Sequence, residues 1–89
     1  LQMYTGRLPI HVLYVSNSTV GVLEHGAFRN LRIQNIQLSD CQLAHIEDGA
    51  FIGQEDTLVN LNLASNLLQI APTEAVRSLR RLSQLDLSR

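Results

Sequence analysis

The chain has 89 residues, which is enough for one small domain. Its hydrophobic fraction of 45% can supply a core, and its formal net charge of −1 gives no reason to expect nucleic acid or an anionic membrane surface as a partner. The apolar runs are only a few residues long, so we expect no direct membrane insertion by this segment. The single cysteine, Cys41, cannot close an internal disulfide.

The chain repeats itself at intervals of about two dozen residues. Copies start at Ile10, Ile33, Leu58 and Leu82, so the starts are separated by 23, 25 and 24 residues. Residues 1–9 match no full copy and are expected to form a capping strand or a degenerate earlier turn. We therefore predict a single repeat segment over 1–89, with repeats at 10–32, 33–57 and 58–81 and a partial repeat at 82–89.

Apolar and polar residues alternate near the start of each copy, as in Leu13-Tyr14-Val15, Ile36-Gln37-Leu38 and Leu61-Asn62-Leu63. This period of two is typical of a strand with one buried face. After each strand the chain must turn and return along the outer side before the next strand begins. Inward positions along this return path are predicted at Val20, Leu43, Leu68, Leu23, Ile46, Phe28 and Phe51.

Two stretches depart from the pattern. Residues 51–57 are longer by two residues than the corresponding stretch of the first copy, so we expect a bulge on the outer side. In the third copy Ala71 takes the place of Leu23 and Ile46, and Val76 takes the place of the phenylalanine. We expect looser packing there and a short helical turn within 73–81.

The spacing Leu-x-x-Leu-x-Leu-x-x-Asn/Cys-x-Leu, as in Leu58 to Leu68, resembles the leucine-rich repeat family over residues 8–89. The Gly-Ala-Phe triplets at 26–28 and 49–51 resemble the animal extracellular type found in Toll-like receptors, Slit-like guidance proteins and chaoptin-like adhesion proteins. The resemblance implies an α/β fold, a right-handed solenoid with a parallel sheet on its concave face and irregular or short helical segments on its convex side. It also implies an extracellular location. Neither end carries a cysteine-rich cap, so we expect either a piece of a longer array or edges that pair with a partner chain.

Ser18, Cys41 and Asn66 occupy the same position in successive copies. In the resembled family this side chain turns inward and bonds to the backbone of neighbouring turns, so the three are interpreted as a structural ladder. Asparagine can donate and accept, whereas serine and cysteine each keep a single donor. For Cys41 a reactive thiol or an intermolecular disulfide remains the alternative.

Outward strand positions should form columns across the concave face. Hydroxyls and amides on a rigid sheet suit a protein ligand, and interface hot spots favour tyrosine and arginine, so Tyr14 and Arg89 are the strongest candidates. Two alternatives stay open: these residues only keep the surface soluble, or the amides cross-link neighbouring strands. The candidate binding residues are Val12, Tyr14, Asn35, Gln37, Asn60, Asn62, Gln84, Asp86 and Arg89.

The sequence shows no arrangement typical of catalysis. His11, His25 and His45 fall at different positions of their repeats, and none has metal-site spacing with Cys41. We therefore expect no enzymatic activity, no metal and no cofactor.

These features predict a protein-interaction module, part of an extracellular receptor or cell-adhesion ectodomain that binds a protein ligand or a homophilic partner. The triplet Asn17-Ser18-Thr19 fits the N-glycosylation pattern and adds a small argument for secretion. Alternatives are a structural spacer within a larger array and an intracellular scaffold.

Overall fold

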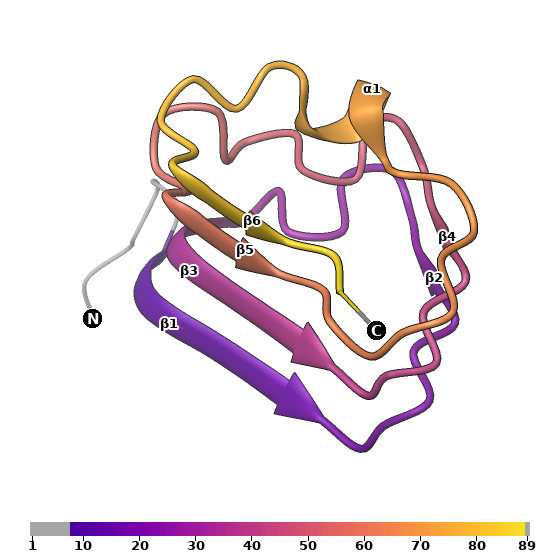
Figure 1. The fold of residues 1–89 in the computed structure, drawn as a ribbon. Coiled ribbons are helices and arrows are strands. Elements are labelled where there is room, and N and C mark those ends of the chain that lie inside the picture. The colour runs from indigo at the N-terminus through magenta and orange to yellow at the C-terminus, as the bar shows by residue number, and fades with distance from the viewer. Residues whose placement is uncertain (1–7, 89) are drawn as a thin grey trace.

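The computed structural model of the chain describes residues 8–88, and they form stacked coils (Figure 1). Each coil contributes one strand to a parallel main sheet, in the order β1-β3-β5-β6. A second parallel pair, β2-β4, lies on the far side of the coils, and the third coil carries α1 on its outer path (Figure 1). The predicted solenoid with one parallel sheet is confirmed. The elements are β1 (Leu8–Ser16), β2 (Val22–Leu23), β3 (Leu31–Ser39), β4 (His45–Ile46), β5 (Asn60–Asn62), α1 (Thr73–Val76) and β6 (Gln84–Asp86).

The predicted inward face of the main sheet is confirmed. Ile36 and Leu38 in β3 are 0% and 3% exposed, and Leu61 in β5 is 1% exposed, because coils stack on both sides of them. Leu13 is only half-buried, since it belongs to the first described coil. Leu85, at the matching position of β6, is 42% exposed because no described residue stacks beyond it.

The outer half of the interior is filled by two phenylalanines. The rings of Phe28 and Phe51 stack with centroids 6.0 Å apart and planes at 11°. A stacked aromatic pair contributes about 0.5–1.5 kcal/mol beyond its buried area. Leu23 and Ile46, both 6% exposed, complete this layer as predicted. Leu43 is fully buried just after the turn, whereas Leu68 is partly buried and Val20 is 37% exposed.

The third coil packs less tightly on its outer path, as predicted. Within 73–81 the structure forms the four-residue helix α1, in which Ala75 is buried and Val76 only half-buried. Ala71 is exposed, and the neighbouring Ile70 is 82% exposed. No described residue of this coil pairs with β4 as β2 does, so the outer sheet stops at two strands.

The stretch 51–57, where a bulge on the outer side is expected, also sends one side chain inward. Its central residue, Gln54, is fully buried. The side-chain nitrogen of Gln54 donates to the carbonyl oxygens of Phe28 and Leu31 at 2.8 and 2.7 Å, and its oxygen accepts from the Ile33 backbone nitrogen at 2.8 Å. The inserted residues therefore send a polar side chain inward to bond with the preceding coil.

Two further predictions concern segments that the structure describes in part. Residues 1–7 of the expected capping segment 1–9 lie outside the described residues, and Leu8 and Pro9 belong to β1. Among residues 8–88, no helix has the length and hydropathy needed to cross a membrane.

Candidate functional site

The outward face of the main sheet, called here the concave face, collects the predicted binding residues in two columns. The strand register places Tyr14, Gln37, Asn62 and Asp86 side by side. It does the same for Val12, Asn35, Asn60 and Gln84. Sequence and structure thus agree on which side chains share this surface. The remaining candidate, Arg89, lies outside the described residues.

Two asparagines of the second column bond across the strands. The side-chain nitrogen of Asn60 donates to the side-chain oxygen of Asn35, and the Asn35 nitrogen donates to the His11 carbonyl oxygen at 3.2 Å. This chain of bonds links β5, β3 and β1. Asn35 and Asn60 are half-buried, and their amides are used within the sheet.

Asn62 and Asp86 bond to backbone at the ends of their own strands. The Asn62 side-chain oxygen accepts from the Ala64 backbone nitrogen at 2.9 Å. One Asp86 carboxylate oxygen accepts from the backbone nitrogen and the hydroxyl of Ser88, at 2.9 and 2.7 Å. These two bonds, the backbone bond first, lower the pKa of Asp86 below its ordinary value because they favour the charged form.

Four candidates remain without a side-chain hydrogen bond to any other residue of the described part: Val12, Tyr14, Gln37 and Gln84. Tyr14 is 62% exposed and Val12 is 45% exposed. Both project from the same face of β1, because side chains two residues apart in a strand point the same way. The concave face therefore offers an aromatic-aliphatic pair at the β1 edge, with Gln37 beside Tyr14 on β3 and Gln84 at the opposite edge on β6.

The ladder residues lie beneath the turn that follows each strand. The Asn66 side-chain oxygen accepts from the backbone nitrogens of Cys41 and Leu43 at 2.8 and 3.0 Å, and its nitrogen donates to the Leu38 carbonyl oxygen. Cys41 is fully buried, with its sulfur 3.5 Å from the Val15 carbonyl oxygen. Among the described residues, the Ser18 hydroxyl bonds within its own coil, to the Ser16 carbonyl oxygen at 3.3 Å. Asn66 and Cys41 thus tie their coils to the coil before.

Asn17, in the N-glycosylation triplet, is exposed at the end of β1. Its φ of 55° lies in the left-handed region, as do those of Asp40 (55°) and Ser65 (60°) at the same position of the next coils. Asparagine, aspartate and serine are small polar residues, and the first two tolerate this conformation better than most. The turn therefore presents the Asn17 side chain to solvent at the rim of the concave face.

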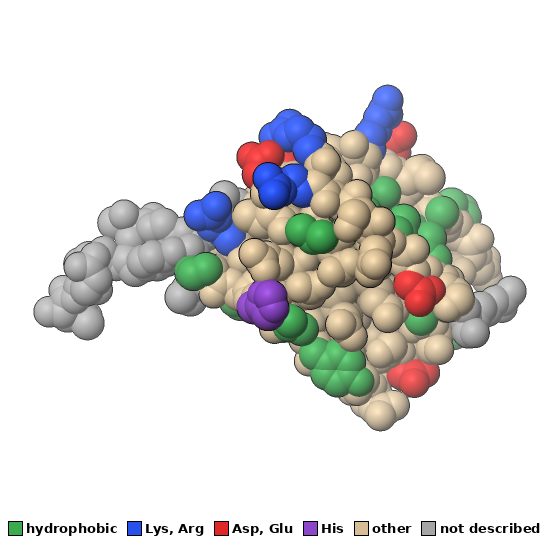
Figure 2. All heavy atoms as spheres, turned by 60° about the vertical axis from the view of Figure 1, so that its left-hand side comes forward, with side chains coloured by type: hydrophobic (Ala, Val, Ile, Leu, Met, Phe, Trp, Pro, Cys, Tyr) green, Lys and Arg blue, Asp and Glu red, His purple; other side chains and the backbone are tan. Residues whose placement is uncertain are grey.

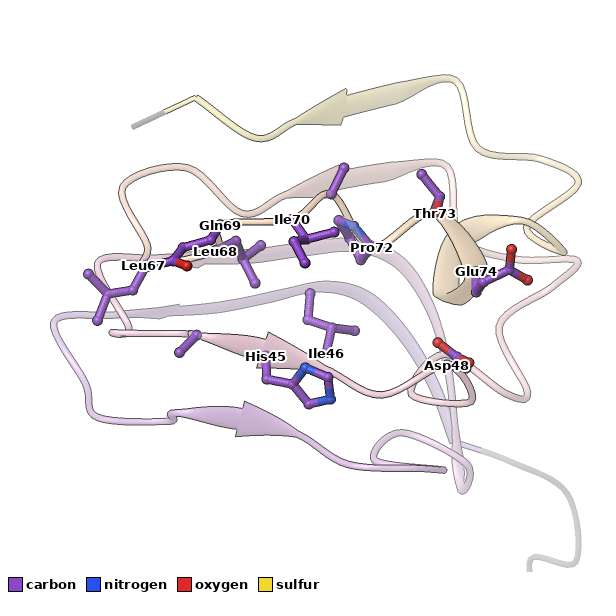
Figure 3. Close-up of a pocket in the computed structure, with 12 residues that line it drawn as sticks. His45, Ile46, Asp48, Leu67, Leu68, Gln69, Ile70, Pro72, Thr73 and Glu74 are labelled. Atoms are coloured by element: carbon purple, nitrogen blue, oxygen red, sulfur yellow. The ribbon is translucent and has the colours of Figure 1, made fainter.

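A groove of about 510 Å³ lies on the other side of the molecule, between β4 and residues 67–74 (Figure 3). Ile46, Leu68 and Ile70 supply apolar lining, and Asp48 and Glu74 lie toward one end (Figure 3). The groove exists because the third coil forms no strand beside β4. None of the predicted site residues lines it.

The described residues contain no group of three or more histidine, cysteine, aspartate or glutamate side chains placed to hold a metal ion. His11, His25 and His45 stand on separate segments, and His25 packs its ring against Gly49. The Cys41 thiol is buried within the ladder.

Stacked coils, one parallel sheet and an inward polar ladder define a repeat solenoid. Compared with known protein families, residues 32–89 match the leucine rich repeat, which is more than half of the chain. The chain belongs to the leucine-rich repeat family, whose members serve in general as protein-interaction modules. A search of curated proteins finds no match.

Proposed function

We propose that this chain binds a protein ligand through its concave face, as part of an extracellular receptor or cell-adhesion ectodomain. The observation that carries the proposal is the exposed pair Val12 and Tyr14 on β1. Tyrosine is enriched at interface hot spots because it buries a large area at small entropic cost. Gln37 and Gln84 stand on the same face, and their amides, which bond to no other residue between 8 and 88, can pair with a ligand backbone.

The extracellular part of the proposal is supported by two sequence features. The Gly-Ala-Phe triplets at 26–28 and 49–51 resemble extracellular repeats, and Phe28 and Phe51 form the stacked pair inside the coils. Asn17 presents an N-glycosylation triplet at an exposed turn. A glycan at Asn17 would stand at the rim of the concave face and limit access to β1.

The second candidate function is that of a structural spacer, with ligands bound elsewhere on a longer array. The bonds from Asn60 to Asn35 and from Asn35 to the β1 backbone favour it, because they show that part of the polar face serves to hold the sheet together. An intracellular scaffold is the lesser alternative.

A binding screen separates these functions. The secreted full-length protein is tested against a panel of extracellular proteins, itself included, beside a variant carrying Tyr14→Ala, Gln37→Arg and Gln84→Arg. None of these side chains bonds to another described residue, so the substitutions leave the packing intact. The matched control carries Ile70→Ala and Gln69→Arg, which alter exposed side chains on the groove side.

We expect a partner that binds the wild type and the control and loses at least tenfold in affinity for the concave variant, since hot-spot truncations cost about 2 kcal/mol or more. Self-binding with this pattern would identify an adhesion role. Equal binding by all three proteins would instead make this segment a spacer.

A further inference from the structure

A second surface lies at the edge of the main sheet where the strands begin. A pocket of about 570 Å³ opens there, lined by residues from all four coils, among them His11, Arg32, Gln34, Thr57 and Arg81. Figure 2 shows arginine side chains (blue) gathered on one part of the surface, with carboxylates (red) between them and a histidine (purple) nearby. The sequence pattern did not predict this site, because its residues come together only when the coils stack.

Two of the arginines have no carboxylate partner in the described part of the chain. The ion pairs among residues 8–88 join Arg80 to Asp56 at 3.0 Å and Arg77 to Glu74 at 3.1 Å. Arg32 and Arg81 are exposed and form neither an ion pair nor a side-chain hydrogen bond with another residue between 8 and 88. A guanidinium carries five N–H donors in a fixed plane, so both arginines offer a full set of donors to a ligand.

The other polar groups of the pocket also favour a ligand that accepts hydrogen bonds. The His11 Nδ1 and the Gln34 side-chain oxygen lie 2.7 Å apart, so Nδ1 donates to that oxygen and the Gln34 side-chain nitrogen is left as a donor. The Thr57 hydroxyl adds another hydrogen-bond donor, because its bond to Gln54 is long at 3.5 Å. Donors therefore outnumber acceptors around the opening between Arg32 and Arg81.

We propose that this pocket, called here the arginine pocket, binds the carboxylate of an aspartate or glutamate in an acidic segment of a partner protein. Arginine pairs with a carboxylate through two parallel N–H···O bonds, which are stronger than neutral hydrogen bonds. This contact goes beyond the concave face, because it uses a different edge of the sheet and needs none of the concave residues.

A protein carboxylate fits this pocket better than a sulfated polysaccharide. Asp56 lines the pocket with its own negative charge, and Glu55 precedes it in the chain. The whole sequence carries eight acidic against seven basic residues. A polyanion would bring many closely spaced charges against Asp56, whereas a single carboxylate can sit between Arg32 and Arg81.

Fluorescence anisotropy with the full-length protein tests the proposal. The probe is a fluorescein-labelled peptide with two glutamates among glycines and serines, and its neutral counterpart carries glutamines. Arg32→Gln and Arg81→Gln are compared with the control Arg77→Gln, which changes another exposed arginine. A labelled heparin-derived oligosaccharide forms the second arm.

We expect the glutamate peptide to bind in a salt-sensitive manner and the glutamine peptide not to bind. Each pocket substitution should weaken binding about threefold, as exposed ion pairs do, and the double variant about tenfold. Arg77→Gln and Tyr14→Ala should leave binding unchanged, so a failure here is separate from a failure at the concave face. The proposal is wrong if the glutamate peptide does not bind, if Arg77→Gln weakens it equally, or if the oligosaccharide binds more tightly through Arg32 and Arg81.

Discussion

Replacing Gln54 by leucine tests whether the buried amide stabilises the stacking of the coils. Leucine has a similar volume, so Gln54→Leu removes the hydrogen bonds without opening a large cavity. Three backbone groups lose a bond: the carbonyl oxygens of Phe28 and Leu31 and the Ile33 nitrogen. The Phe28 oxygen keeps a partner, because it also accepts from the Leu31 nitrogen at 2.9 Å.

The expected cost follows from the two groups that lose most, the Leu31 oxygen and the Ile33 nitrogen. Leaving a buried polar group without its partner costs about 1–3 kcal/mol. Burying an apolar leucine in place of an amide offsets about 1.5–3 kcal/mol of the total. We therefore expect Gln54→Leu to lower the free energy of unfolding by about 2 kcal/mol.

Urea denaturation followed by circular dichroism measures this change. The matched control is Gln69→Leu, which alters an exposed glutamine and should change the free energy of unfolding by no more than about 0.5 kcal/mol. Equal midpoints for Gln54→Leu, the control and the wild type would refute the reasoning, because the amide would then contribute nothing net.

Gln54→Glu adds a pH test of the same contacts. A buried carboxylate facing the Phe28 and Leu31 carbonyl oxygens is disfavoured, so the folded state should raise the pKa of this glutamate above its ordinary value of about 4.3. The variant should therefore be most stable below that value, where the carboxyl is protonated in both states. Its stability should fall as the pH rises toward the raised pKa of the folded state. A variant whose stability is the same at acidic and neutral pH would contradict this.

The remaining predictions concern the ladder and the end of β6. Asn66→Ala leaves the buried Cys41 and Leu43 nitrogens without acceptors, so it should lower the free energy of unfolding by about 3 kcal/mol in urea denaturation. Cys41 is 0% exposed, so a thiol reagent should label it only in denaturant, and rapid labelling of the native protein would contradict the ladder role. Ser88→Ala removes one of two bonds that lower the pKa of Asp86, so that pKa should rise toward 3.8 while staying below it, as followed by carboxyl NMR titration. The stabilising contribution of Asp86 is present above pH 3.8 and should be lost as the pH falls through its lowered pKa. Ser88→Ala should narrow the pH range over which this contribution is lost.

The strand pattern predicted the inside and outside of the main sheet correctly, because side chains alternate with a period of two in every strand. Ile36 and Leu61 are buried where the alternation places them, and Gln37 and Asn62 share the opposite face. The copy spacing also predicted the register, since strands 23 and 25 residues apart pair at equivalent positions.

Gln54 could not be assigned from the pattern. It belongs to an insertion that has no counterpart in the first copy, so no periodic position says whether its side chain points in or out. The direction depends on which backbone groups of the preceding coil are left to bond, and only the folded coil shows them. The signal available in the sequence was the length of the insertion, which indicated an irregularity but not its direction.

The arginine pocket could not be predicted from the sequence for a different reason. Arg32 and Arg81 lie far apart in the sequence, and each reads as an ordinary exposed charge. Arg32 lies one residue before the copy start Ile33 and Arg81 one residue before the copy start Leu82, so stacking of the coils brings both to the same edge of the sheet. The repeat spacing places the two arginines at equivalent positions, but it does not show that a pocket opens beside them.

The hydrogen bonds of the concave face leave Val12 and Tyr14 at the β1 edge as its main candidates for ligand contact. Asn35 and Asn60 bond to each other, and Asn62 and Asp86 bond to the backbone, so these four side chains have less to offer a ligand than the sequence suggests. Those bonds also hold the strands in place, so less conformational entropy is lost when a ligand binds. The exposed apolar side chains of this face, Val12 and Tyr14, belong to β1, and Asn17 directly follows that strand. If Asn17 carries a glycan, Asn17→Gln should therefore increase the rate of ligand association at the concave face and leave peptide binding at the arginine pocket unchanged.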